Sequence, residues 1–278
     1  MENSTALGMN RTGIQMAPLS GTDMIEFAQE RGMDAPPHEG KFEEMHRIYV
    51  EEAEKIGSVP VPGTMKGMLK TGGAKLMGNS PEVLVDKLGE RLAFERTSAR
   101  VYEAMIQKFT ALQGALPLND IDNAETDAYE SLDNGETALS EDGGTTSTMS
   151  QAGNRINLAM LTRIHNEELE HFHMLKEALE ELGADPTAMT PCADVVGVTS
   201  LGILQTVTDP RTTIAQCLNA LLTAELTDTA SWELLMEVAE ELGHDDMAVR
   251  FSVAYNAESE HLATVKTWLR NEVMAEAV

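Results

Sequence analysis

The amino-acid sequence predicts an all-α protein whose main part is a four-helix bundle. Two observations support this prediction: four long segments carry apolar residues at every third or fourth position, and the alternation typical of β-strands is absent from them. Each segment holds about 30 residues, which makes a rod of about 45 Å at 1.5 Å per residue. Four such rods bury their apolar faces by packing lengthwise against one another.

The expected helices of the bundle span about residues 80–114, 154–182, 209–243 and 245–274. The first begins clearly, because Ser80 can cap a helix, Pro81 suits its first turn and Glu82 complements the helix dipole. Gly183 ends the second, since glycine readily adopts the left-handed conformation that closes a helix.

The lengths of the connections predict the relative directions of these helices. Only a short turn at Gly243 and His244 separates the third helix from the fourth, so these two are antiparallel neighbours. The second and third helices are separated by residues 184–209. A crossover of this length can return along the bundle, which makes the second and third helices parallel. Its apolar part, residues 195–207, can form a short helix.

Outside the four helices we expect an N-terminal part and an insertion. Residues 1–79 are expected to form an arm with a short amphipathic helix at 41–56, and residues 80–278 the bundle. Within the bundle, an acidic insertion at about residues 115–153 is either a solvated loop or an entry path that attracts cations.

The composition excludes several classes of function. The 278 residues include 46 acidic and 20 basic side chains, a formal net charge of −26, so the surface repels phosphate backbones and no nucleic-acid partner is expected. The two cysteines are too few for a disulfide scaffold or a cysteine-based zinc or iron–sulfur site. No segment is typical of an export signal or a membrane span, so we expect a cytoplasmic location.

The chain contains an internal repeat that links its second and fourth helices. Residues 164–171 (IHNEELEH) correspond to residues 254–261 (AYNAESEH), and the asparagine, two glutamates and the histidine coincide. The second and fourth helices therefore each carry Glu-x-x-His, as Glu168 with His171 and as Glu258 with His261.

The first and third helices also correspond, residues 95–102 (ERTSARVY) to residues 225–232 (ELTDTASW). Glu95 and Glu225 begin these segments, and each is followed by a threonine two positions later and by a large aromatic residue, Tyr102 or Trp232, at the end. Each glutamate also precedes the Glu-x-x-His motif of the next helix, and the acidic insertion accounts for the longer separation in the first case. The chain is thus two copies of a helical hairpin, with an insertion in the first copy.

This spacing predicts a metal site. Residues three apart lie on one face of a helix, and the four glutamates and two histidines lie within apolar stripes that face the bundle centre. Four buried carboxylates at one place are untenable without protons or cations, whereas two divalent ions balance their charge. An oxygen-rich set with one imidazole per metal suits iron or manganese. A bridging pair, Glu168 and Glu258, would hold two ions about 3.5–4 Å apart.

With these residues the sequence resembles the ferritin-like superfamily, most closely the di-iron carboxylate bundles of the bacterioferritin and rubrerythrin type. The resemblance covers about residues 80–116 and 154–275. The cysteine-rich electron-transfer domain of rubrerythrins is missing, and the third helix offers Asp228 where rubrerythrins have a second glutamate. The resemblance implies two iron or manganese ions held by terminal ligands Glu95 and Glu225, bridging ligands Glu168 and Glu258, and histidine ligands His171 and His261.

Further polar residues are expected beside the ligands. His165 and Tyr255 lie one turn before the bridging glutamates. They are expected either to be ordinary hydrogen-bonded core residues or to serve the site as hydrogen-bond donors, as an extra ligand or, for Tyr255, as a redox-active tyrosine. Asp228 can orient a ligand histidine by accepting its second N–H. Tyr102 and Trp232 are expected to serve as packing residues. The remaining acidic neighbours are expected to be solvated: Glu167, Glu170 and Glu260.

The site predicts a function. We expect a dinuclear iron or manganese oxidoreductase that reacts with dioxygen or peroxide and is ferroxidase-like or peroxidase- or catalase-like. The alternatives are a metal-storage or metal-buffering protein and a bundle with a structural role. The expected partners are metal ions and dioxygen or peroxide, without nucleic acid or membrane, and the chain is expected to form a homo-oligomer, in the first instance a dimer.

Overall fold

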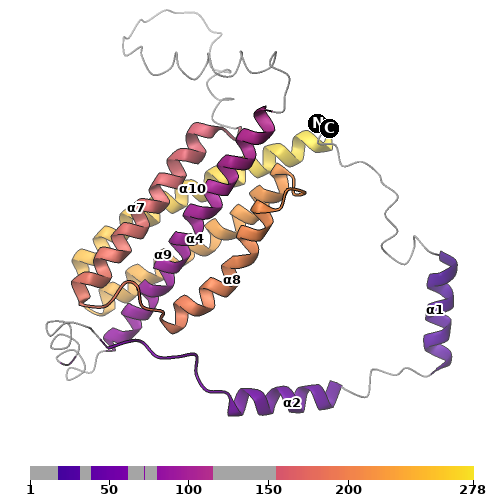
Figure 1. Ribbon diagram of the computed structural model, residues 1–278, viewed down its shortest axis with the longest axis horizontal. Coiled ribbons are helices and arrows are strands. Elements are labelled where there is room, and N and C mark those ends of the chain that lie inside the picture. Colours follow the sequence, from indigo (N-terminus) through magenta and orange to yellow (C-terminus); the bar gives the residue numbers. More distant parts are fainter. Residues whose placement is uncertain (1–17, 32–38, 62–71, 73–79, 115–154) are drawn as a thin grey trace, which may run out of the picture. The chain divides into compact units, whose positions relative to one another are not determined.

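The structure is a computed structural model that describes residues 18–31, 39–61, 72, 80–114 and 155–278, and every regular element in these ranges is α-helical (Figure 1). None of the described helices is long and apolar enough to cross a membrane. In chain order the helices are α1 (Pro18–Glu30), α2 (Glu39–Glu52), α4 (Pro81–Gly114), α7 (Leu158–Leu182), α8 (Pro191–Thr208), α9 (Ile214–Glu241) and α10 (Asp245–Ala277).

The described helices fall into two compact units. Helices α1 and α2 belong to the unit within Ser4–Ile56, and the five longer helices belong to the unit that runs from Gly57 to Val278. The short amphipathic helix expected at 41–56 is α2, whereas α1 lies in a stretch whose weak periodicity did not predict a helix. The acidic insertion expected at 115–153 lies outside the described residues.

Helices α4, α7, α9 and α10 are the four expected members of the bundle, and the crossover forms α8. Helix α4 packs against α7, α8 and α9, while α10 packs against α9 and α7. Because α8 runs back along the bundle, α7 and α9 point in the same direction (Figure 1). The fold is therefore a helical bundle with a helical crossover, as the connection lengths predict.

Local signals explain where these helices begin and end. Gly183, with φ 80°, ends α7 as expected, because the left-handed conformation lets its N–H bond to the carbonyl of Glu180. Helix α9 begins a few residues later than the sequence suggested. Thr213 and Gln216 form a reciprocal capping box there, while Asp209 lies at the end of α8.

Two apolar clusters fill the bundle and leave a polar layer between them. One cluster includes Leu92 and Trp232, and the other includes Tyr102 and Leu221. The predicted metal-site residues fall between the two clusters along each helix; Glu95, for example, lies between Leu92 and Tyr102 on α4. Apolar packing on both sides thus fixes the position of four helices around one buried layer.

Candidate metal centre

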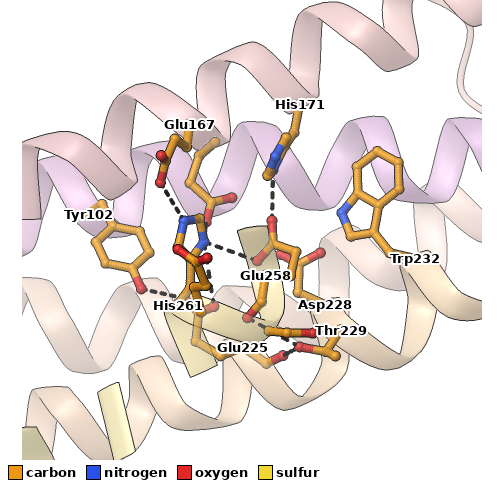
Figure 2. A network of polar contacts seen from close by, with 12 residues as sticks. Tyr102, Glu167, His171, Glu225, Asp228, Thr229, Trp232, Glu258 and His261 are labelled. Carbon is orange, nitrogen blue, oxygen red and sulfur yellow. Dashed lines mark hydrogen bonds and ion pairs between the residues drawn. The ribbon is translucent and has the colours of Figure 1, made fainter. Parts of the chain in front are cut away.

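The six residues predicted as ligands converge in this layer. Each is 5 % exposed or less, although all are charged or polar. They come from four helices: one glutamate each from α4 and α9, and one Glu-x-x-His motif each from α7 and α10. Figure 2 shows part of this cluster, with His171, Glu225, Glu258 and His261 labelled around a common centre.

Within the described residues, the side chains form two overlapping groups that could each hold a metal ion. The first ligand group consists of Glu95, Glu168, His171 and Glu258, and the second ligand group of Glu168, Glu225, Glu258 and His261. In each group the candidate ligand atoms lie within 4.8 Å of one another. Glu168 and Glu258 belong to both groups, which is the arrangement that a bridging pair requires.

Both histidines direct Nδ1 towards the shared carboxylates. The Nδ1 atom of His171 lies 2.7 Å from Oε1 of Glu258. The Nδ1 atom of His261 lies 3.2 Å from Oε2 of Glu258 and 3.4 Å from Oε1 of Glu168. The two imidazole rings are 6.2 Å apart between centroids, so each can serve a different position of a metal pair.

Unpaired atoms in the layer fit a cation. Six buried side-chain atoms of the cluster lack a hydrogen-bond partner among the described residues: Oε2 of Glu95, both carboxylate oxygens of Glu168, Nδ1 of His171, Oε2 of Glu225 and Oε1 of Glu258. The 2.7 Å contact between His171 and Glu258 is short but poorly aligned for a hydrogen bond. Buried carboxylates and imidazoles are normally paired or coordinate metals, so this donor set fits divalent cations.

Without metal, protons stabilise the cluster. Burial, reinforced by the neighbouring carboxylates, raises the pKa of Glu168 well above its usual range and that of Glu225 to about 8. Burial acts in the same direction on Glu258, but His171 and His261 outweigh it and lower its pKa to about 2. Burial opposes the charge of His261, yet contact with Glu258 raises its pKa to about 9.

Tyr102 and Trp232 do more than fill space, because both donate hydrogen bonds to terminal glutamates. The hydroxyl of Tyr102 donates to Oε1 of Glu225, and Nε1 of Trp232 donates to Oε1 of Glu95 at 2.9 Å. In both glutamates the other oxygen, Oε2, has no hydrogen-bond partner within the described residues. The aromatic pair thus fixes one oxygen of each terminal carboxylate and leaves the other facing the cluster.

Asp228 is buried beside the cluster, but it does not orient a histidine as expected. It pairs with Arg91 of α4, which also donates to Oε1 of Glu95 at 2.7 Å. The helical pattern of the sequence does not predict a role for Arg91. Its place in the apolar stripe between Leu88 and Leu92 was the available signal, since an arginine there must be buried and paired.

Glu167 takes the role that was expected of Asp228. Its Oε2 lies 2.7 Å from Nε2 of His261, and its side chain is only 25 % exposed, so it is not the solvated residue that we expected. Contact with His261 lowers the pKa of Glu167 although burial opposes this. A carboxylate on the outer nitrogen fixes the tautomer that leaves Nδ1 free to bind a metal.

His165 and Tyr255 are not members of either ligand group in the described part of the chain, and their expected role beside the site stays a prediction. Tyr255 is half-buried against the apolar cluster that contains Trp232. His165 is half-buried, contacts Asn166 at 3.3 Å and lines a cleft of about 170 Å³ between α4 and α7. Neither residue belongs to a group that could hold a metal ion among the side chains that the structure describes.

Comparison with known proteins agrees with this geometry. Residues 158–274 match the family model of the ferritin-like domain. The ferritin-like match covers α7, α8, α9 and most of α10, and it includes five of the six expected ligands; only Glu95 on α4 lies outside it. It supports the ferritin-like superfamily for this bundle, and the buried carboxylate and histidine cluster suggests metal binding. No curated protein and no solved structure matches the chain.

Proposed function

We propose that the buried cluster binds two iron or manganese ions and that the protein is an oxidoreductase acting on dioxygen or peroxide. The observation that supports this proposal is the overlap of the two ligand groups in Glu168 and Glu258. Two separate mononuclear sites would not need shared residues. A dinuclear site does need them, because bridging carboxylates hold the two ions at a short separation.

Each side chain has a defined task in this proposal. Glu95 and Glu225 would each hold one ion through Oε2, because their Oε1 atoms already accept hydrogen bonds from the protein. Glu168 and Glu258, which belong to both ligand groups, would hold both ions, and His171 and His261 would each offer Nδ1. Four carboxylates then balance two divalent cations, so the loaded site is neutral.

When bound, a pair of iron or manganese ions supplies two-electron exchange with dioxygen or peroxide. The chain's own residues prepare the place for it. Apolar packing on both sides keeps bulk water away from the ligands. Glu167 holds the outer nitrogen of His261, and Tyr102 presents its hydroxyl proton to the carboxylate of Glu225. These contacts keep the ligands in place while the charge of the site changes.

Elemental analysis of protein purified without chelator tests the binding step. We expect two iron or manganese ions per chain, and we expect Glu168→Ala to lose both because the variant lacks a ligand common to the two groups. Glu170→Gln is the matched control, since Glu170 is an exposed glutamate on the same helix. A chain that binds no metal after anaerobic reconstitution with Fe(II) and Mn(II) contradicts the proposal.

Activity then separates the proposed enzyme from its alternatives. The Fe(II)-loaded protein should consume dioxygen or peroxide, or the Mn(II)-loaded protein should decompose peroxide, and Glu168→Ala should abolish this activity. Many metal ions per chain in a closed shell would indicate storage instead. Full folding without stoichiometric metal would indicate a structural bundle.

A further inference from the structure

The internal repeat is broken at the positions that contact the ligands. When Glu95 is aligned with Glu225, Arg91 corresponds to Leu221 and Asp228 to Ser98. When the two Glu-x-x-His motifs are aligned, Glu167 corresponds to Ala257. The two ligand groups therefore contain the same ligand types but have different neighbours, and the difference changes how strongly each group can bind a cation.

Arg91 weakens the first ligand group. Its guanidinium is buried and donates at 2.7 Å to Oε1 of Glu95, which also accepts a hydrogen bond from Trp232. A charged donor withdraws electron density from the carboxylate and places a positive charge close to the position that a cation would take. Asp228 compensates the charge of Arg91 as a whole, but the guanidinium is the partner that touches the ligand.

The second ligand group lacks this positive charge and gains a negative one. Its terminal ligand, Glu225, accepts a hydrogen bond from the neutral hydroxyl of Tyr102. Its histidine, His261, is held through Nε2 by the carboxylate of Glu167 at 2.7 Å. A carboxylate on the outer nitrogen makes an imidazole a stronger metal ligand. At the matching position, Ala257 has no side-chain oxygen to offer His171.

We propose that the two metal positions fill in order, with the position of Glu225 and His261 binding first and more tightly than the position of Glu95 and His171. This inference rests on the proposed function, because it needs two ions in the cluster. Partners of metal-bound histidines typically change metal affinity by about 10- to 100-fold, so we expect the two dissociation constants to differ at least tenfold.

Anaerobic titration of the metal-free chain with Mn(II) at about pH 9, followed by electron paramagnetic resonance, tests the order at a pH where protons on Glu225 and His261 compete little with the metal. One equivalent should give the spectrum of an isolated ion, and the second should convert it into that of a coupled pair. Glu95→Ala should abolish only the weaker step, whereas Glu225→Ala should abolish the tighter one. A coupled pair that forms from the first addition onwards overturns the proposal.

Two variants test whether the differences between the two repeats cause the order of metal binding. Glu167→Gln keeps the shape of the partner but removes its charge, so it should weaken the tighter step about tenfold and leave the weaker step unchanged. Ala257→Glu gives His171 a carboxylate at the matching position and should narrow the gap between the two steps. The control Glu170→Gln should alter neither step. If the dissociation constant of the tighter step is unchanged in Glu167→Gln, the carboxylate of Glu167 does not strengthen that step.

The outcomes separate this inference from the proposed function. Two ions bound with equal affinity leave the dinuclear site intact and overturn only the order of filling. A chain that binds no Mn(II) and no Fe(II) overturns both.

Discussion

At the scale of single residues, the metal-free cluster holds protons on groups that would bind the metal ions. Burial and neighbouring carboxylates raise the pKa of Glu168 well above its usual range and that of Glu225 to about 8, so Glu225 holds a proton at neutral pH, and His261 is protonated there because its pKa is about 9. Metal ions require these groups without their inward protons. Binding of a metal pair must therefore release protons.

We predict that metal affinity rises with pH up to about pH 9. The pKa of Glu225, about 8, and that of His261, about 9, fix the upper part of this window. Calorimetric titration with Mn(II) at pH 6.5 and pH 8.5 should give tighter binding at the higher pH. Repeating it in buffers of different ionisation enthalpy should give the number of protons released. Affinity that does not depend on pH contradicts this exchange.

The same pKa shifts predict that the metal-free fold becomes less stable as the pH rises, whereas metal affinity increases. A group whose pKa is raised on folding stabilises the fold below its unfolded pKa and loses this contribution as the pH rises through its folded pKa. For Glu225 the window runs from 4.5 to about 8, and for His261 from 6.5 to about 9. Metal-free protein should therefore lose thermal stability between these limits, and bound metal should restore it.

Residue-level prediction is strongest where a single helix carries the whole motif. Glu168 with His171, and Glu258 with His261, are three residues apart, so helical geometry alone places each pair on one face. The contact of Arg91 with Asp228 joins residues 137 apart in the sequence, and that of Glu167 with His261 joins residues 94 apart. Such contacts depend on the rotation of one helix against another, which periodicity does not define.

At the scale of helices, the crossover helix α8 is anchored to α4 by a close approach. Thr190 caps α8 by accepting a hydrogen bond from the N–H of Ala193, and its hydroxyl also contacts the carbonyl of Asp86 on α4. Gly89 permits this approach, because a Cβ atom at its position would lie 2.6 Å from Oγ1 of Thr190. Thr190 is buried and cannot move away freely.

We predict that Gly89→Ala destabilises the bundle. The added methyl group displaces the capping hydroxyl, and overpacking of this kind typically costs about 1–3 kcal/mol. Thermal unfolding should show a lower midpoint than in the parent chain. Gly202→Ala is the matched control, since Gly202 lies in α8 with nothing within 4 Å of the added Cβ. The control should be neutral or stabilising by about 0.5–1 kcal/mol, as alanine is the better helix former.

The ends of the helices were predictable to the extent that local signals define them. Pro81 and Gly183 lie where α4 begins and α7 closes, because both act through their own backbone. The start of α9 was predicted too early, since a proline at 210 offers a start signal that the capping box at Thr213 overrides. Helix α1 was missed because its apolar residues do not form a clear stripe.

At the scale of the whole bundle, the internal repeat explains why the ligands converge. Two copies of a hairpin place equivalent glutamates at equivalent heights, and antiparallel packing of helices brings them to one layer. The sequence predicts this convergence because the correspondence of Glu95 with Glu225, and of the two Glu-x-x-His motifs, is visible without coordinates. It does not predict which copy binds metal more tightly, because that depends on contacts between the copies.

Because all four helices donate ligands, metal binding should stabilise the bundle as one unit. A ligand that binds only the folded state stabilises it by about 2.7 kcal/mol at a free concentration 100 times its Kd. Calorimetry should therefore show a midpoint temperature of unfolding that rises when Mn(II) is added and falls back to its starting value when a chelator removes the metal. With a net charge of −26, any divalent salt also reduces self-repulsion, so an equal concentration of Mg(II) is the control. In the parent chain, Mn(II) should raise the unfolding midpoint well beyond the rise that Mg(II) causes. In Glu168→Ala, the rise with Mn(II) should be no larger than that with Mg(II). Equal rises with the two ions in the parent chain would mean that only charge screening acts.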